Sequence, residues 1–317
     1  MDQDLPPGVH SFRLVDDPLA DWLRDAPLPV HLVEPGFAPA GAVPEGVKNW
    51  DYYDGAIVMV GITDGETYTI EGSGVMVAPG LVLSATHVLR DHADAIAART
   101  LSVYCIGVRS GKRADLWAVR RSLRYAEDSS DIMFLGVELN SEISDDWYVS
   151  CLPISTRAPE EGESLTIVGY RFDQPDALSE PLPIIRGVRA VGRGDLFVAV
   201  GETETIHYPD RDRLLAPFPA IEIGCGSLNG MSGGAVIDEG GALVGILSRG
   251  LDTEDGRGPS IAAWIIHALM FDVTLPWPPG VYAPDTPILD LPEDQLKIHG
   301  RDKVRLVRPM ELEYTAW

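Results

Sequence analysis

Residues 224–250 read GCGSLNGMSGGAVIDEGGALVGILSRG, and this stretch decides how the rest of the sequence is interpreted. It places Ser232 in a Gly-x-Ser-Gly-Gly turn, where glycines adopt tight positive-φ geometry without a Cβ clash. Two apolar runs follow, 235–237 and 242–247, and the turn residues 238–241 between them predict a hairpin. The motif fits either an ordinary serine in a glycine-rich hairpin or a nucleophile presented beside backbone N–H groups. The rest of the chain has to decide between these two interpretations.

Short apolar runs separated by turn residues occupy most of the chain from residue 51 to residue 271. A charged connector (140–146) divides them into two successive sets of about six strands, which predicts two packed all-β units. The predicted strands are 56–62, 67–70, 74–77, 81–84, 101–108, 116–123 and 132–139 in the first set, and 165–172, 184–191, 196–200, 220–223, 235–237, 242–247 and 261–264 in the second. Short helices are predicted after His87, through Ala97, and over 267–271.

The composition excludes several classes of protein and partner. The formal charge of −23 would repel nucleic acids and anionic membranes, so neither is an expected partner. Three irregularly spaced cysteines do not form a disulfide framework and suit buried thiols in a reducing compartment. No apolar run reaches the length of a membrane span, and the first residues lack the features of a secretory signal. We therefore expect a cytoplasmic location.

The two ends of the chain differ from its middle. Residues 1–49 form a proline-rich arm, because their many prolines prevent long regular elements. The middle, 50–273, is expected to be one domain with units at about 50–140 and 147–273. The tail, 274–317, is proline-rich at first and then mixes apolar with basic residues, which predicts a hairpin. This basic tail either docks on the acidic body or serves as a partner-binding or autoinhibitory segment.

Two residues in the first set of strands supply what an activated serine needs, a base and a carboxylate that orients it. His87 ends the apolar LVLSATH at the start of a loop, and Asp131 begins the apolar DIMFLGVEL. Alone, each has an ordinary interpretation as a strand-end histidine or a turn-capping aspartate. No Cys or His spacing fits zinc, so we expect no metal and no cofactor.

Together, the motifs resemble the chymotrypsin/trypsin-like serine peptidase family in its bacterial, disulfide-free, HtrA-like form. They are GSGVMVAPGLVLSATHV around His87, SSDIMFLGVE around Asp131, GMSGGAV around Ser232, and GILSRG after it. The resemblance covers about residues 51–271. It implies two six-stranded antiparallel β-barrels with a short C-terminal helix, and a catalytic triad in the cleft between the barrels.

The resemblance also implies the role of each site residue. Ser232 would attack the scissile carbonyl, His87 would carry its proton, and Asp131 would orient His87. The N–H groups of Gly230 and Ser232 would form the oxyanion hole. The implied substrate-binding residues are Gly226, Ser227, Leu247, Ser248, Arg249 and Gly250.

Substrate specificity follows from the same correspondence. Gly226 stands at the base of the P1 pocket and is not acidic, which argues against Arg or Lys at P1. Leu247 stands where glutamate-specific relatives have a histidine, which argues against an acidic P1. We therefore expect a modest, fairly apolar pocket beside Ser227 and Gly250. Residues 248–250 would pair with an extended substrate, and Arg249 would modify the preference.

Met231 is the main departure from the family, which often has Asp or Asn before the serine. Activation by a newly cleaved N-terminus is therefore not expected. The loop is either preformed or ordered by a partner protein, the arm or the tail. The sequence predicts a serine endopeptidase acting on a protein or peptide and regulated in one of these ways. The alternative is a catalytically silent fold that serves as a peptide-binding or assembly module.

Overall fold

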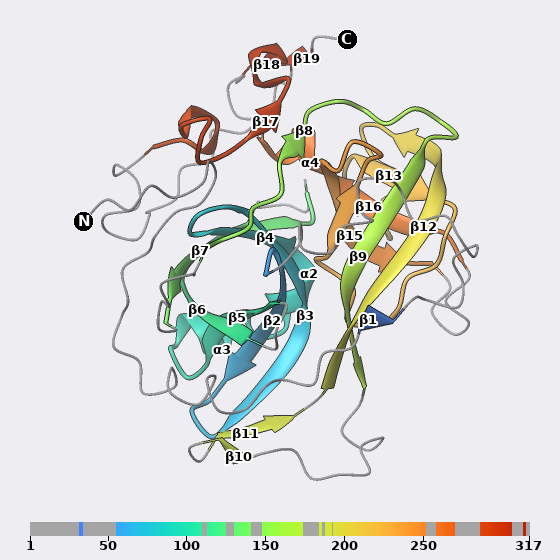
Figure 1. The fold of residues 1–317 in the computed structure, drawn as a ribbon. Helices are drawn as coiled ribbons and strands as arrows, with labels where there is room; N and C mark the ends of the chain where they lie inside the picture. Colours follow the sequence, from blue (N-terminus) through green and yellow to red (C-terminus); the bar gives the residue numbers. More distant parts are fainter. Residues whose placement is uncertain are drawn as a thin grey trace.

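The computed structural model describes residues 32–33, 55–109, 113–124, 130–140, 148–173, 184–185, 188–191, 193–251, 258–269, 286–305 and 313–314. Its body consists of two closed six-stranded antiparallel barrels, seen side by side in Figure 1. This confirms the predicted all-β double barrel. The predicted arm, 1–49, lies outside the described residues except for β1 (Leu32–Val33), which pairs in parallel with β12 (Arg193–His207).

The first barrel comprises β2 (Ile57–Thr63), β3 (Thr67–Ala78), β4 (Leu81–Ala85), β5 (Ser102–Arg109), β6 (Arg113–Arg124) and β7 (Ile132–Leu139). Its strand order is β3-β2-β5-β6-β7-β4, and β4 closes the ring on β3. Large apolar side chains such as Ile57, Trp117 and Phe134 are almost completely buried. The segments predicted as 67–70 and 74–77 are one strand, β3, with an irregular register where Gly72 and Ile70 face β2.

The second barrel comprises β9 (Ser164–Asp173), β12, β13 (Ala220–Ile223), β14 (Ala235–Ile237), β15 (Leu243–Gly250) and β16 (Ser260–Trp264). Its order is β14-β9-β12-β13-β16-β15, and β15 closes the ring on β14. The hairpin predicted after Ser232 is therefore confirmed. Asp238 stabilises its turn, since the Asp238 carboxylate accepts the N–H of Ala242 at 2.9 Å.

Residues 184–191 do not form the single second-set strand that the apolar pattern predicts. They form β10 (Ile184–Ile185) and β11 (Val188–Val191), and β11 pairs in parallel with β3 of the first barrel. The reason is that β9 and β12 pair with each other and each already has a second neighbour, β14 and β13. The closed barrel offers no free edge there.

Three short helices complete the body. The predicted helical region after His87 contains α2 (Thr86–Arg90) and α3 (Ala93–Ala97), and the predicted closing helix is α4 (Ile265–Leu269). His87 therefore lies within the first turn of α2, directly after β4. Among the described residues, no helix combines the length and the hydropathy that a membrane crossing requires.

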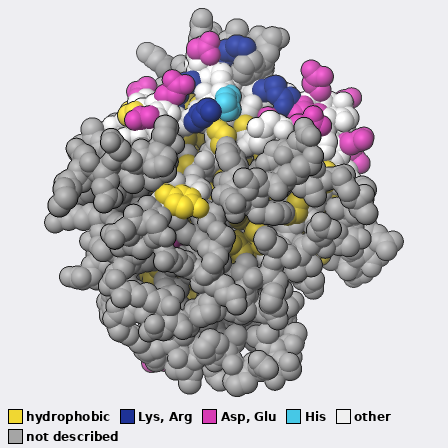
Figure 2. All heavy atoms as spheres, in the orientation of Figure 1, with side chains coloured by type: hydrophobic (Ala, Val, Ile, Leu, Met, Phe, Trp, Pro, Cys, Tyr) yellow, Lys and Arg dark blue, Asp and Glu magenta, His cyan; other side chains and the backbone are white. Residues whose placement is uncertain are grey.

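The described part of the tail packs on the body through β8 (Ile154–Ser155), which follows the first barrel. It contains η4 (Ile288–Asp290), β17 (Ile298–His299), η5 (Arg301–Lys303) and β18 (Val304–Arg305), and β18 pairs with β19 (Glu313–Tyr314). β17 pairs in parallel with β8. The tail buries Ile288, Leu291, Leu296 and Ile298 in the main core. On the face drawn in Figure 2, basic and acidic side chains gather over this tail.

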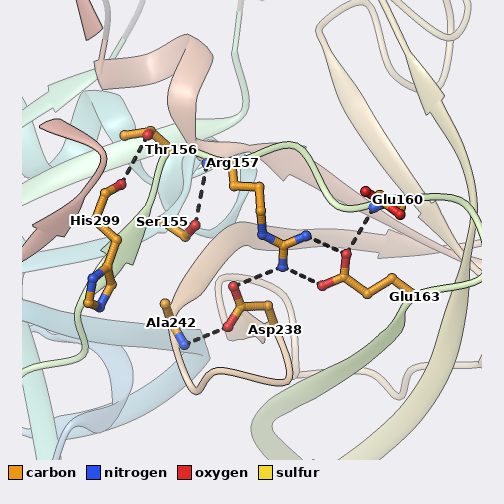
Figure 3. Close-up of polar contacts among 8 residues, drawn as sticks. All are labelled: Ser155, Thr156, Arg157, Glu160, Glu163, Asp238, Ala242 and His299. Atoms are coloured by element: carbon orange, nitrogen blue, oxygen red, sulfur yellow. Dashed lines mark hydrogen bonds and ion pairs between the residues drawn. The ribbon is translucent and has the colours of Figure 1, made fainter. Parts of the chain in front are cut away.

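Arg157, just after β8, joins this region to the second barrel (Figure 3). Its guanidinium donates to both carboxylate oxygens of Glu163, and it also lies 3.2 Å from the carboxylate of Asp238. Burial opposes ionisation of Glu163, but the hydrogen bonds from Arg157 outweigh it and hold the pKa of Glu163 below its ordinary value. Arg157 therefore connects the start of β9 to the β14–β15 turn.

Replacing Arg157 with Met is expected to lower the free energy of unfolding at pH 7 by about 1–2 kcal/mol. The value stays below that of a fully buried pair because about a third of the Arg157 side chain is exposed. Glu163 has a depressed pKa, so its contribution is present above its ordinary pKa and is lost as the pH falls. Urea unfolding should therefore show a smaller difference from wild type at pH 3 than at pH 7.

Arg213→Met is the matched control for this measurement, because Arg213 is exposed and makes no ion pair among the described residues. It should leave the free energy of unfolding unchanged at both pH values. A loss in Arg157→Met that is equal at pH 7 and pH 3 would contradict the electrostatic origin.

Candidate active site

His87 and Asp131 face each other at the edge of the first barrel. His87 Nδ1 lies 2.7 Å from Asp131 Oδ2, and the His87 main-chain N–H donates to Asp131 Oδ1 at 3.1 Å. A further bond, from the Thr86 N–H to the Asp131 carbonyl at 2.8 Å, holds α2 against the start of β7. The His87 side chain is 28% exposed whereas that of Asp131 is 3% exposed. The carboxylate is thus buried behind an imidazole that reaches the surface.

The second barrel supplies a third donor to this carboxylate. The buried hydroxyl of Ser248, on β15, donates to Asp131 Oδ2 at 2.6 Å. Burial alone would raise the pKa of Asp131, but the hydrogen bonds and charge of His87, together with Ser248, hold that pKa below its ordinary value. Asp131 therefore stays ionised at neutral pH. A carboxylate in this position favours the tautomer of His87 with its proton on Nδ1.

Ser232 comes from the loop before β14 and lies against both barrels. Its main-chain carbonyl accepts the N–H of Ser73, on β3, at 2.8 Å. Its hydroxyl donates to the main-chain carbonyl of Ser248 at 3.0 Å. Within the described residues, no hydrogen bond joins this hydroxyl to His87. The structure thus links Ser232 and Asp131 through one residue, Ser248, while the Ser232 hydroxyl points to a carbonyl.

Ser73 is a positioning residue that the sequence interpretation missed. Its hydroxyl donates to the Gly230 carbonyl at 2.9 Å and accepts the Tyr170 N–H at 2.8 Å, so it connects the serine loop to β9. Gly72 beside it allows this approach, because a Cβ there would lie 2.9 Å from the Ser232 carbonyl oxygen. The signal in the sequence is Gly72-Ser73-Gly74, because glycines inside a strand pattern indicate a bulge or a close backbone approach.

Met231 packs where the family often has a carboxylate. Its side chain is fully buried in the core cluster of the second barrel, and the Leu228 N–H approaches its sulfur at 3.4 Å. Gly169 makes room for it, since a Cβ at that position would lie 3.1 Å from Met231 Cβ. Apolar packing of Met231 therefore anchors the loop before Ser232.

The two N–H groups predicted to form an oxyanion hole have no acceptor among the described residues. They belong to Gly230 and Ser232. The N–H of Gly233, in the same loop, instead donates to the main-chain carbonyl of Leu247 at 2.7 Å. Gly230 has a φ of +93° and Gly233 a φ of +86°. A Cβ on Gly233 would meet the Ser73 carbonyl oxygen at 2.0 Å, so this close packing requires glycine.

The residues predicted to bind substrate lie at two depths. Gly226 and Ser227 are buried. A Cβ on Gly250 would lie 2.9 Å from Ser227 Oγ, so Gly250 and Ser227 lie close together as two walls of the predicted P1 pocket. Leu247 is buried among the apolar side chains of the second barrel. Arg249 is partly exposed, and its Nε is a buried atom that makes no hydrogen bond in the described structure.

The open edge of β15 lies beside these residues. β14 pairs with β15 only as far as Ile246, whereas β16 pairs with it through Gly250. Among the described residues, the segment from Ser248 to Gly250 therefore has a strand neighbour on one side only, and its other edge is open to main-chain hydrogen bonds.

Alternative nucleophiles and metal centres find little support in this region. Burial raises the pKa of the Cys225 thiol to about 12, and it raises those of Cys105 and Cys151 as well. A buried thiol with such a pKa is not a thiolate at neutral pH. Within the described ranges, no three His, Cys, Asp or Glu side chains come close enough to hold a metal ion together.

Comparison with known proteins identifies one family. The model described as "Trypsin-like peptidase domain" matches residues 72–246, which is more than half of the 317 residues. The matched region includes His87, Asp131 and Ser232. No curated protein sequence gives a match.

Several solved structures are similar to this chain at low sequence identity. The active form of the Rv3671c protease from M. tuberculosis is 15% identical, with a TM-score of 0.46 over 74% of this chain and 85% of that chain. The HtrA-type protease AlgW with a decapeptide is 15% identical, with a TM-score of 0.45 over 70% of this chain and 65% of that chain. This chain thus spans slightly less than two thirds of AlgW.

Proposed function

The chain belongs to the trypsin-like peptidase family, and from this premise we propose that it is a serine endopeptidase with Ser232, His87 and Asp131 as its catalytic triad. The family match confirms the resemblance predicted from the sequence. The observation that carries the proposal is the buried Asp131 carboxylate, whose Oδ2 is hydrogen-bonded both to His87 Nδ1 and to the Ser248 hydroxyl. Ser248 in turn accepts the hydroxyl of Ser232 through its carbonyl.

The first half of the reaction forms an acyl-enzyme. Ser232 Oγ attacks the scissile carbonyl carbon while its proton moves to His87 Nε2, and Asp131 stabilises the resulting imidazolium. The N–H groups of Gly230 and Ser232, which have no acceptor among the described residues, receive the oxyanion. The tetrahedral intermediate then breaks its C–N bond, and His87 gives the proton to the leaving amine. Water repeats these steps to release the acid and restore Ser232.

Substrate binding prepares the serine in this proposal. An extended protein or peptide substrate that adds to the open edge of β15 brings its own N–H to the Ser248 carbonyl. That carbonyl now accepts the Ser232 hydroxyl, so the substrate displaces it. The released hydroxyl then turns to His87 Nε2 as its acceptor. The serine is thus activated in the presence of a correctly placed substrate.

The walls at Ser227 and Gly250 support an uncharged P1 residue of modest size. They approach each other closely, and neither carries a charge that would pair with a basic or acidic side chain. Met231 supports a preformed serine loop, because its packing needs neither a new N-terminus nor a partner protein.

A catalytically silent peptide-binding module is the second candidate. The observation in its favour is that the Ser232 hydroxyl donates to Ser248 instead of to His87. Such a module would use the open edge of β15 to hold a peptide without cleaving it.

Labelling with a fluorophosphonate separates the two candidates. The purified protein should gain one adduct by intact mass, peptide mapping should place it on Ser232, and a peptide library should be cleaved. Neither signal should appear in Ser232→Ala. If wild type and Ser232→Ala bind peptides equally, and wild type neither labels nor cleaves, the endopeptidase proposal is wrong.

A further inference from the structure

A cavity of about 560 Å³ lies on the first barrel, and its lining includes Thr86, the neighbour of His87 in sequence, and Met133, two residues after Asp131. Its lining residues come from α2, from α3 and the segment that follows it, and from β5, β6 and β7. Apolar side chains, including Leu89, Ile96 and Val103, line part of it. We call it the arginine cavity because four arginines also line it, Arg90, Arg99, Arg120 and Arg121.

The charge of the arginine cavity is opposite to that of the protein. The chain has a net charge of −23, yet none of the described residues that line the cavity is Asp or Glu. Arg120 has a partner, Glu138, at 2.8 Å. Arg99 and Arg121 form no ion pair among the described residues, although Arg121 donates to the Arg120 carbonyl. These two exposed guanidinium groups therefore have no counter-ion among the described residues.

The backbone is irregular where these arginines are placed. A register shift lies between Val119 and Arg121 on β6, and both Arg120 and Arg121 line the cavity. Arg99 has a φ of +59° and is the one non-glycine residue with positive φ in the described chain. Such a conformation costs free energy, and it persists here at a residue that lines the cavity.

Thr86 carries a buried hydroxyl beside the cavity. It lines the cavity, it is 6% exposed, and its hydroxyl oxygen has no hydrogen-bond partner among the described residues. A buried hydroxyl without a partner is costly, so such groups commonly mark a site for water or a ligand.

We propose that the arginine cavity binds a small organic anion that has an apolar body and at least two negative charges, carried by phosphate or carboxylate groups. Guanidinium groups pair with both kinds of anion through two parallel hydrogen bonds. The cavity volume falls in the range of small-molecule sites, and the apolar wall would bury the body of the ligand. Nucleic acid does not suit the site, because the surrounding chain is strongly acidic.

The position of the cavity makes its ligand a regulator of the active site. Thr86 precedes His87 on α2, and its N–H binds the Asp131 carbonyl. Met133, two residues after Asp131, also lines the cavity. A ligand that orders this wall therefore acts on the elements that hold the His87–Asp131 pair. This regulatory part rests on the proposed function, whereas the binding part does not.

Isothermal titration calorimetry tests the binding part. The probes are ATP, pyrophosphate and citrate in the presence of EDTA, with adenosine as the uncharged comparison. We expect ATP to bind more tightly than pyrophosphate, because the face of its adenine ring can pack on the apolar side chains of the cavity. Adenosine, which carries no negative charge, should not bind. Citrate binding comparable to that of pyrophosphate would assign the site to carboxylates as well as phosphates.

The variants are Arg99→Gln with Arg121→Gln, and a control, Arg213→Gln with Lys297→Gln, that removes the same charge from exposed positions elsewhere. The cavity variant should weaken binding by roughly tenfold or more, and the control should bind like wild type. Absence of binding by all three anions, or equal binding in both variants, would overturn the site.

The rate of Ser232 labelling by a fluorophosphonate tests the regulatory part. A saturating anion should change this rate in wild type and in the control, and not in the cavity variant. An unchanged rate despite measured binding would overturn regulation and leave the binding site standing. If Ser232 does not label in any state, the proposed function fails, and calorimetry still decides whether the cavity binds anions.

Discussion

Replacing Ser232 with Ala is expected to lower kcat for a peptide substrate by about a million-fold, the loss seen when a triad nucleophile is removed from a serine protease. In the proposed mechanism Ser232 Oγ forms the covalent bond with the substrate, so without it His87 and Asp131 have no proton transfer to assist. A residual rate of about a thousand-fold over water should remain, because the N–H groups of Gly230 and Ser232 persist in the variant. His87→Ala should lower kcat to a similar extent.

The measurement is single-substrate kinetics on a peptide found by library cleavage, with circular dichroism and thermal unfolding to show that the fold is intact. Ser232 is held by its main chain, through the Ser73 N–H, so loss of the hydroxyl should leave the loop in place. Ser164→Ala, on β9, is the matched control and should behave like wild type. Retention of more than about one per cent of wild-type kcat in Ser232→Ala would assign the nucleophile elsewhere.

Much of the fold was predictable because its strands alternate with strong turn signals. The strands at 132–139, 220–223 and 235–237 begin and end where the apolar runs do. The runs at 196–200 and 184–191 were misjudged, since the first belongs to the longer β12 and the second pairs with the other barrel. Local pattern shows which residues are apolar, whereas pairing depends on which strand edges remain free.

The site was predictable to the extent that its chemistry needs particular residue types. A nucleophile, a base and a carboxylate can be recognised from motifs, and the structure brings His87 and Asp131 together. The supporting contacts of Ser73 and Met231 were not predictable, because they depend on which loops meet between two barrels. The Ser73 hydroxyl joins the Gly230 carbonyl to the Tyr170 N–H, and no periodic pattern in the sequence around Ser73 predicts these long-range hydrogen bonds.

The arginine cavity shows the same limit. Its four arginines come from α2, the segment after α3, and β6, and only the barrel geometry brings these segments together. Composition gave the opposite impression, because the chain as a whole is strongly acidic. A local concentration of one charge against the net charge therefore becomes visible only in three dimensions.

Asp131→Asn is expected to lower kcat by about ten-thousand-fold while leaving the fold close to wild type. Asp131 accepts on both oxygens, from the His87 main-chain N–H at Oδ1 and from His87 Nδ1 and Ser248 Oγ at Oδ2. An asparagine has one acceptor oxygen and one NH₂ donor. If its NH₂ replaces Oδ1, it faces the His87 N–H, and two donors repel each other.

If the NH₂ of the new asparagine side chain instead replaces Oδ2, it donates to His87 Nδ1. The imidazole proton then lies on Nε2, and a protonated Nε2 cannot accept the proton of Ser232. Ser248 tolerates this exchange, because its hydroxyl can accept as well as donate. The loss should therefore appear in kcat and in the rate of fluorophosphonate labelling, with KM nearly unchanged. Ser248→Ala removes one of the same hydrogen bonds without altering the tautomer, so its loss of kcat should be at least a hundred-fold smaller than that of Asp131→Asn. Equal losses in the two variants would mean that Asp131 acts by holding the barrels together and not by selecting the tautomer of His87.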